Sequence, residues 1–368
     1  MATNHLAIRD GALVLADGST FEGELIGAET AGGVTSGEVV FNTVMSGYQE
    51  VISDPSYAGQ IITFTTAHLG NYGVTPADDE GSRVWCRGVV LRDLARRRSS
   101  WRSDGDLDEY LRRAGVAGIA GVDTRRLTRT LRDGGSMPGA FGSADQITLK
   151  AAAIDAASTD GLDLVSEVTC RETSVAARAA GAADRTIVAV DCGIKTTIVR
   201  CLAEIGTVHI VPSTTSAADI MALHPDGVFL SNGPADPSAV QVVPDTIRSL
   251  LGEVPIFGSC MGHQLLATAL GGTTFKLPFG HHGGNHPVRD LETGRIEITS
   301  QNHNYCVDLE GTKGVEVTHV NLNDGTLEGF RSTEVAAFGI QFHPEAGPGP
   351  HDSRYLFSRF ADLMDYRR

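Results

Sequence analysis

The 368-residue sequence has no run of apolar residues approaching the ~18 that a membrane-spanning helix needs. It also has no excess of basic residues, because 30 Lys and Arg stand against 45 Asp and Glu, a net charge of −15. The acidity is spread over both halves of the chain, so no broad basic surface is available to follow a phosphate backbone. We therefore expect neither a membrane nor a nucleic acid as a partner.

Cysteine motifs and nucleotide-binding motifs are absent as well. The six cysteines form no CxxC pair and are widely and irregularly spaced, which indicates neither a disulfide scaffold nor a cysteine zinc site and fits a reducing cytoplasm. The sequence contains no GxxxxGK[ST] and no GxGxxG after a strand. Recognisable phosphate-binding loops are thus missing from this chain.

The order of apolar runs predicts two domains of the α/β class. The first 150 residues mix strands and helices. They include a hairpin around the Asp-Gly turn at 17–18 and two amphipathic helices, one in DLDEYLRRAG and one from Asp123 to the Gly134-Gly135 pair. Residues 151–185 are rich in Ala, Ser and Thr and are predicted to be a linker. From 186 to 368, strand and helix patterns alternate at first, which predicts a mostly parallel sheet flanked by helices.

The strongest chemical signal is VPIFGSCMGHQLL, in which a β-type run meets Gly-Ser-Cys-Met-Gly and a helix follows. This is a cysteine version of the nucleophile elbow, in which flanking glycines permit a sharp strand-to-helix turn. The turn would expose the sulfur of Cys260 at a helix N-terminus, which favours its thiolate. A buried structural cysteine at an ordinary strand–helix junction is the alternative interpretation.

A second signal is AAFGIQFHPE near the C-terminus. On an extended strand, side chains two residues apart point the same way, so His343 and Glu345 would share one side. Glu345 could then accept a hydrogen bond from one imidazole nitrogen and leave the other for a thiol, as in catalytic triads. The alternative is a polar pair at a surface strand end, but the order Cys, His, Glu in one α/β domain favours catalysis.

GSCMGHQLL together with QFHPE resembles the class I, triad-type glutamine amidotransferase family. The resemblance extends over nearly the whole chain, through VMSGYQEVISDPSYAGQII, GVDTRRLTRTLR, VFLSNGPADP, FGHHGGNHPV and SQNHNYCVD, to the small subunits of carbamoyl-phosphate synthetase. It implies an N-terminal small-subunit domain at 1–150, which contacts the partner and borders the active site, and a glutamine amidotransferase domain at 186–368.

The resemblance also implies roles for individual residues. Cys260 would attack the amide carbon of glutamine, His343 would transfer protons, and Glu345 would orient His343. The backbone N–H groups of Met261 and Gly233 would hold the oxyanion. The expected glutamine-binding positions are Ser46, Gly233, Ala235, Met261, Gln264, Asn302, Asn304 and Tyr305.

Two of these positions depart from the family pattern. Ala235 stands where the SNGPGDP loop has its second glycine, and it adds a methyl group where the backbone comes close to its surroundings. Asn304 replaces a glycine, although asparagine tolerates left-handed backbone better than most residues. These changes bear on the affinity for glutamine and not on the chemistry.

The family resemblance further implies a large subunit that uses ATP and Mg²⁺ to make carbamoyl phosphate for arginine and pyrimidine synthesis. No cofactor and no metal are expected in this chain, and the GHHGGNH histidines at 281, 282 and 286 are interpreted as a structured loop. Two rival functions remain: a free-standing cysteine amidase or peptidase, and a catalytically silent module that regulates a synthetase.

Overall fold

The computed structural model describes residues 9–366 as two compact units. The first unit comprises residues up to Ser53 together with Gly59–Thr159, and the second comprises Asp54–Ala58 together with residues from Asp160 onwards. Residues 151–185, predicted to be a linker, contain the end of α4, the short helix α5 (Val165–Val168) and strand β8 (Ser174–Ala176). No helix in residues 9–366 is long and apolar enough to cross a membrane.

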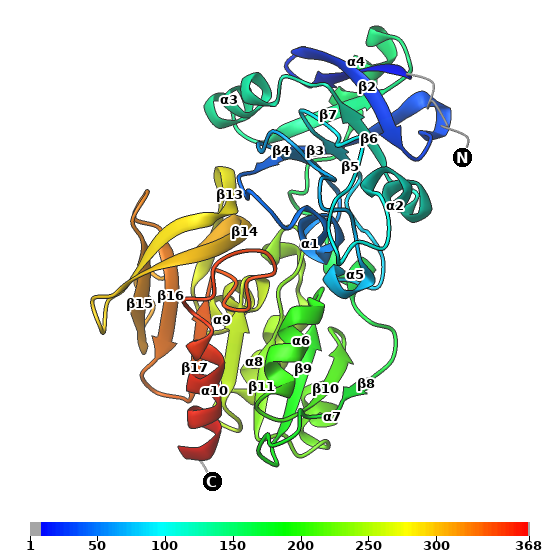
Figure 1. The fold of residues 1–368 in the computed structure, drawn as a ribbon. Helices are drawn as coiled ribbons and strands as arrows, with labels where there is room; N and C mark the ends of the chain where they lie inside the picture. Colours follow the sequence, from blue (N-terminus) through cyan, green and yellow to red (C-terminus); the bar gives the residue numbers. More distant parts are fainter. Residues whose placement is uncertain (1–8, 367–368) are drawn as a thin grey trace. The chain divides into compact units, whose positions relative to one another are not determined.

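The first unit is a closed barrel with strand order β1-β2-β6-β5-β4-β3-β7 (Figure 1). Its strands are β1 (Asp10–Leu15), β2 (Thr20–Gly27), β3 (Val34–Asn42), β4 (Gln60–Phe64), β5 (Gly88–Val90), β6 (Ala117–Ala120) and β7 (Met137–Gly142). Its helices are α1 (Tyr48–Ser53), α2 (Leu107–Ala114), α3 (Thr124–Gly134) and α4 (Gln146–Asp155). Strands β1 and β2 form the predicted antiparallel hairpin.

Local sequence signals set the ends of the two predicted amphipathic helices in this unit. Asp123 caps α3 by accepting a hydrogen bond from the backbone N–H of Arg126. Helix α2 ends at Gly115, whose φ of 72° lies in the left-handed region that glycine adopts without cost. Both helices lie where the sequence predicted them.

The second unit contains a ten-stranded sheet with order β14-β13-β15-β16-β17-β12-β11-β9-β10-β8. Five adjacent strands are parallel: β10 (Thr207–Pro212), β9 (Thr186–Asp191), β11 (Gly227–Leu230), β12 (Ile256–Ser259) and β17 (Ala337–Ile340). An antiparallel extension consists of β13 (Thr273–Asp290), β14 (Ile296–Asp308), β15 (Val315–Asn321) and β16 (Leu327–Ser332). The α/β class and the parallel core are as predicted.

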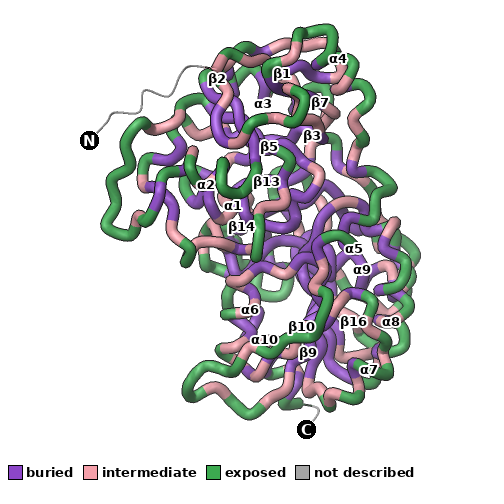
Figure 2. The backbone as a smooth tube through the Cα atoms, turned by 90° about the vertical axis from the view of Figure 1, so that its right-hand side faces the viewer, coloured by how far each residue is buried: buried purple, intermediate pink, exposed green. Residues whose placement is uncertain are grey.

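Helices cover both faces of the parallel strands. Alternate residues of β9 enter different cores, with Val188 and Val190 on one face and Ile187 and Ala189 on the other, as the two-residue period of a strand requires. One face packs against α7 (Ala217–Met221), α8 (Val242–Leu250) and α9 (Met261–Ala269), and the other against α6 (Thr196–Ala203) and α10 (Tyr355–Tyr366). Strand β9 is accordingly buried in all but its first residue (Figure 2), and β11, β12 and β17 are buried throughout, whereas most residues of β10 are only half-buried.

Candidate active site

Cys260 occupies the predicted strand–turn–helix junction, between β12 and α9. Its φ of 53° and ψ of −108° place a non-glycine residue in a strained backbone region, which is typical of functional sites. The flanking glycines are required, since a Cβ atom at Gly258 would lie 2.5 Å from the Gly262 carbonyl oxygen and one at Gly262 would lie 2.1 Å from that of Leu230. The elbow is therefore fixed by close backbone contact on both sides.

His343 and Glu345 lie beyond the end of β17 and not on an extended strand, so that premise of the sequence analysis was wrong. Pairing stops at Ile340, and Pro344 has no N–H with which to continue it. The expected contact forms all the same, because His343 Nδ1 lies 2.8 Å from Glu345 Oε1. Nε2 of His343 is buried and makes no hydrogen bond of ordinary geometry in the described chain, which leaves it for the thiol.

The charges around His343 favour its protonated form. Burial by itself lowers the pKa of this imidazole, but the Glu345 carboxylate and the Cys260 thiol outweigh burial and raise the pKa to about 10. A protonated imidazole beside a sulfur at the start of α9 is the arrangement that stabilises a thiolate. The group can therefore act as an ion pair in which sulfur is the nucleophile.

Lys195 is a member of this site that the sequence analysis missed. It lies in the loop between β9 and α6, is only 2% exposed, and donates from Nζ to Glu345 Oε1 at 2.9 Å and to the Ala346 carbonyl oxygen at 2.6 Å. Burial raises the pKa of Glu345, but Lys195 and His343 together lower it to about 2. The only signal in the sequence is a lysine shortly after a buried strand, in DCGIKTT.

The SNGPADP loop follows β11 and is attached to the elbow, since the N–H of Gly262 donates to the Ser231 carbonyl oxygen at 2.9 Å. Only glycine fits at position 233, where a Cβ atom would lie 2.3 Å from the Cys192 carbonyl oxygen. Ala235 has a φ of 68°, so the methyl group does stand at a left-handed position that favours glycine. As the first residue of α9, Met261 has an N–H without a partner inside the helix.

Four of the predicted glutamine-binding residues lie around Cys260 in the second unit. The Cys260 thiol lies 3.5 Å from the Asn302 carbonyl oxygen, and the Gln264 side-chain amide donates to the Tyr305 carbonyl oxygen at 2.8 Å. His282 bridges the side-chain amides of Asn302 and Asn304 with contacts of 2.9 and 3.0 Å. Ser46 belongs to the first unit, where it is exposed, and its role stays a prediction.

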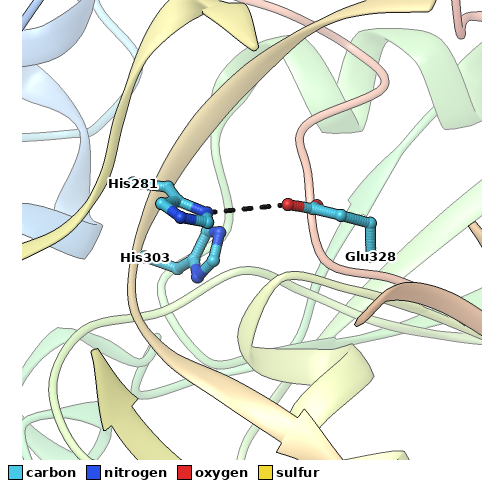
Figure 3. A group of neighbouring side chains, drawn as sticks. All are labelled: His281, His303 and Glu328. Carbon is cyan, nitrogen blue, oxygen red and sulfur yellow. Dashed lines mark ion pairs between the residues drawn. The ribbon is translucent and has the colours of Figure 1, made fainter. Parts of the chain in front are cut away.

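His281, His303 and Glu328 form a buried group with the composition of a metal site (Figure 3). Each potential ligand already has a partner within the protein. His281 contacts Asp324 at 2.8 Å and Glu328 at 3.6 Å, and His303 contacts the Tyr305 carbonyl oxygen at 2.8 Å.

Both oxygens of Glu328 also accept hydrogen bonds, one from Gln301 at 3.0 Å and the other from Asn321 at 2.8 Å. Burial lowers the pKa of His281, but Glu328 and Asp324 outweigh burial and raise it. An imidazole held between two carboxylates accounts for this group, and we assign it no metal.

Comparisons with known proteins place both units of the chain. The glutamine amidotransferase class-I family profile matches residues 188–363, and the profile of the carbamoyl-phosphate synthase small chain, CPSase domain, matches residues 13–141.

Similar proteins described as carbamoyl phosphate synthase small chains occur in bacteria and in a plant. That of Syntrophotalea carbinolica is 49% identical over 97% of this chain and 98% of its own, and that of Pseudomonas syringae pv. tomato is 48% identical over the same shares. The chloroplastic small chain of Oryza sativa subsp. japonica is 44% identical over 98% of this chain and 83% of its own. The chain therefore belongs to the carbamoyl-phosphate synthase small-chain family and carries its class I glutamine amidotransferase domain.

Proposed function

We propose that Cys260, His343 and Glu345 catalyse the hydrolysis of glutamine to glutamate and ammonia. The thiolate attacks the side-chain amide carbon, a C–S bond forms, and His343 gives its proton to the departing nitrogen, so that ammonia leaves a glutamyl thioester. His343 then takes a proton from water, which attacks the thioester and regenerates the thiol. The observation that carries this proposal is the strained elbow of Cys260 beside an imidazole that is paired with Glu345.

The remaining predicted residues have supporting roles in this scheme. The N–H groups of Met261 and Gly233 stabilise the negative oxygen of each tetrahedral intermediate. Within the second unit, substrate glutamine is bound by Gly233, Ala235, Met261, Gln264, Asn302, Asn304 and Tyr305, and the family resemblance adds Ser46 of the first unit as a prediction. Lys195 keeps Glu345 ionised, and Glu345 in turn holds the proton of His343 on Nδ1 when the imidazole is neutral.

Ammonia from glutamine is what a small chain of this family supplies to carbamoyl-phosphate synthesis. The relatives are named small chains, which implies a large-chain partner. We propose that this partner receives the ammonia through an enclosed path and performs the steps that use ATP and Mg²⁺, with bicarbonate as the carbon source. This chain would then need no cofactor, and its six free cysteines fit a cytoplasmic location.

The test is to change Cys260 to Ser in the assembled enzyme and to measure carbamoyl phosphate formation with each nitrogen donor. Glutamine-dependent synthesis should disappear, because a serine hydroxyl is hardly ionised beside this imidazole. Synthesis from ammonia at high concentration should persist. Loss of both activities in a correctly assembled complex would contradict the proposed division of labour, and release of ammonia from peptides instead of glutamine would favour an amidase or peptidase.

A further inference from the structure

Five residues from the N-terminal half of the chain belong to the amidotransferase unit. Asp54–Ala58 lie in the chain between α1 and β4, both of which are elements of the barrel, yet they form part of the second unit. The segment contains a short 3₁₀ turn, η2 (Pro55–Tyr57), and it is buried, with Asp54 4% exposed and Tyr57 1% exposed. The amidotransferase unit therefore has a carboxylate in its interior that the matched stretch 188–363 does not supply.

The carboxylate of Asp54 is held by three nitrogen donors. Oδ1 accepts from the backbone N–H of Ser56 at 2.9 Å and from the side-chain amide of Asn232 at 3.4 Å, and Oδ2 accepts from the side-chain amide of Asn302 at 2.8 Å. A buried carboxylate is costly unless such bonds replace its water. Because a carboxylate only accepts hydrogen bonds, it also dictates how both amides are oriented.

The orientation of Asn302 follows from this contact. With its amide nitrogen turned to Asp54, its Oδ1 faces His282 Nδ1 at 2.9 Å, so His282 must carry a proton on Nδ1. His282 also stands against Tyr57, with ring centroids 5.9 Å apart. Both ends of the Asn302 side chain are thus fixed, and the carbonyl oxygen of the same residue lies 3.5 Å from the Cys260 thiol.

Asn232 is fixed in the same way. Its amide nitrogen donates to Ser56 Oγ at 2.9 Å in addition to Asp54, and its Oδ1 accepts from the backbone N–H of Lys195 at 3.3 Å. The next residue in the chain is Gly233. The Asp54 carboxylate therefore connects the loop that carries Gly233, an expected oxyanion donor, with Asn302, whose carbonyl oxygen lies beside the Cys260 sulfur.

We propose that Asp54 is a positioning residue for the glutamine pocket, which holds the side chains of Asn232 and Asn302 in the orientation that substrate binding requires. This inference rests on the proposed function, because the pocket it shapes is the one assigned to glutamine. Asp54 acts through the two asparagines and takes no part in bond making, so its removal should weaken glutamine binding more than it slows the chemical step.

The first test changes Asp54 to Ala and measures the steady-state kinetics of the enzyme assembled with its large chain. The KM for glutamine should rise about tenfold or more, kcat should change by less than about threefold, and synthesis from ammonia should match wild type. Asp290→Asn is a matched control: Asp290 is 3% exposed and accepts hydrogen bonds within its own turn, from the N–H of Glu292 and the hydroxyl of Thr293. Its KM should stay at the wild-type value.

A rescue experiment separates positioning from mere stability. Asn302→Asp should raise KM strongly, since it places two carboxylates against each other. In the double variant Asp54→Asn with Asn302→Asp, the amide of residue 54 can donate to residue 302 while its oxygen still accepts from Ser56 and Asn232. We expect the double variant to reverse most of the increase in KM that Asn302→Asp causes.

The outcomes distinguish the possibilities. An unchanged KM in Asp54→Ala, equal losses with glutamine and ammonia, or additive losses in the double variant would each overturn the positioning role. If the wild-type complex itself released no ammonia from glutamine, the proposed function would fail first and the inference would fall with it.

Discussion

Replacing Lys195 by Met removes the ammonium group that donates to both Glu345 and the adjacent Ala346 carbonyl oxygen. The substitution keeps a similar volume and an apolar stem, and it removes the charge together with both hydrogen bonds. At 2.9 Å the attraction between the ammonium and the carboxylate is roughly 6 kcal/mol at an effective dielectric constant of 20, before either group's desolvation is subtracted. Removing one partner of a buried pair typically costs about 3–5 kcal/mol.

We expect the lower end of that range, about 3 kcal/mol, because Glu345 keeps the imidazole of His343 as its second partner. For a unit of this size, a loss of 3 kcal/mol lowers Tm by roughly 6–12 °C. The pKa of Glu345 is lowered to about 2 in the folded chain, so its contribution to stability is complete above its ordinary value of 4.5 and is lost as the pH falls through 2. Without Lys195 that loss should begin at a higher pH.

The pH dependence of the rate and of unfolding tests whether Lys195 acts by keeping Glu345 ionised. At pH 8 Glu345 should still be ionised in Lys195→Met, so kcat should fall by less than about tenfold, while the acid limb of the rate profile and of thermal unfolding should move up by about two pH units. Arg185→Met is the control, because it breaks a half-exposed pair with Asp365 and should leave both acid limbs in place. An acid limb that does not move, or complete inactivity at pH 8 with an intact fold, would refute the argument.

Three further predictions concern the elbow and its neighbouring loop. Ala235→Gly removes a Cβ atom from a left-handed position, which relieves about 1–2 kcal/mol of strain in the folded chain and costs about 0.4–1 kcal/mol through the entropy of the unfolded chain. Titration with glutamine should give an unchanged KM or one at most about tenfold lower, and a large loss of glutaminase activity would contradict this. Gly262→Ala should destabilise the chain by about 3 kcal/mol, because its Cβ atom would meet the Leu230 carbonyl oxygen. Gly271→Ala, whose Cβ atom meets nothing, should cost only about 1 kcal/mol of backbone strain in thermal melts, and equal losses of stability in the two variants would refute the steric account. A limiting amount of an electrophilic glutamine analogue should modify Cys260 alone by peptide mapping, since burial raises the pKa of every other cysteine; labelling mainly at Cys86 or Cys306 would overturn the assignment.

Features set by neighbouring residues could be predicted from the sequence. The caps of α2 and α3, the first hairpin and the strand–turn–helix at Cys260 all depend on residues within a few positions of one another. Closure of the barrel could not be predicted, because it needs β1 to pair with β7 and β2 with β6 across most of the unit. Pairings over such distances leave no periodic signal in a single sequence.

In the candidate site, too, contacts between residues close in the sequence could be predicted and those between distant residues could not. The order of Cys260, His343 and Glu345 indicated a triad, and the contact between the last two exists, although the strand on which it was predicted already ends at Ile340. Lys195 was missed because its partner is 150 residues away, and Asp54 because the Asn302 side chain it orients is 248 residues away. For a single Lys or Asp, the surrounding sequence does not indicate which distant residue it will contact.

The placement of residues 54–58 means that the amidotransferase unit cannot be obtained by a single cut of the chain. The backbone passes between the units three times, at 53/54, 58/59 and 159/160, so a protein that begins at residue 160 would have the sulfur, the imidazole and the lysine but no carboxylate facing Asn232 and Asn302. Its amides would be left to pair with water or with each other. Such a fragment should retain the catalytic groups and bind glutamine poorly. A chimera of two relatives should therefore be functional only when the relative that provides the C-terminal half also provides the segment at residues 54–58.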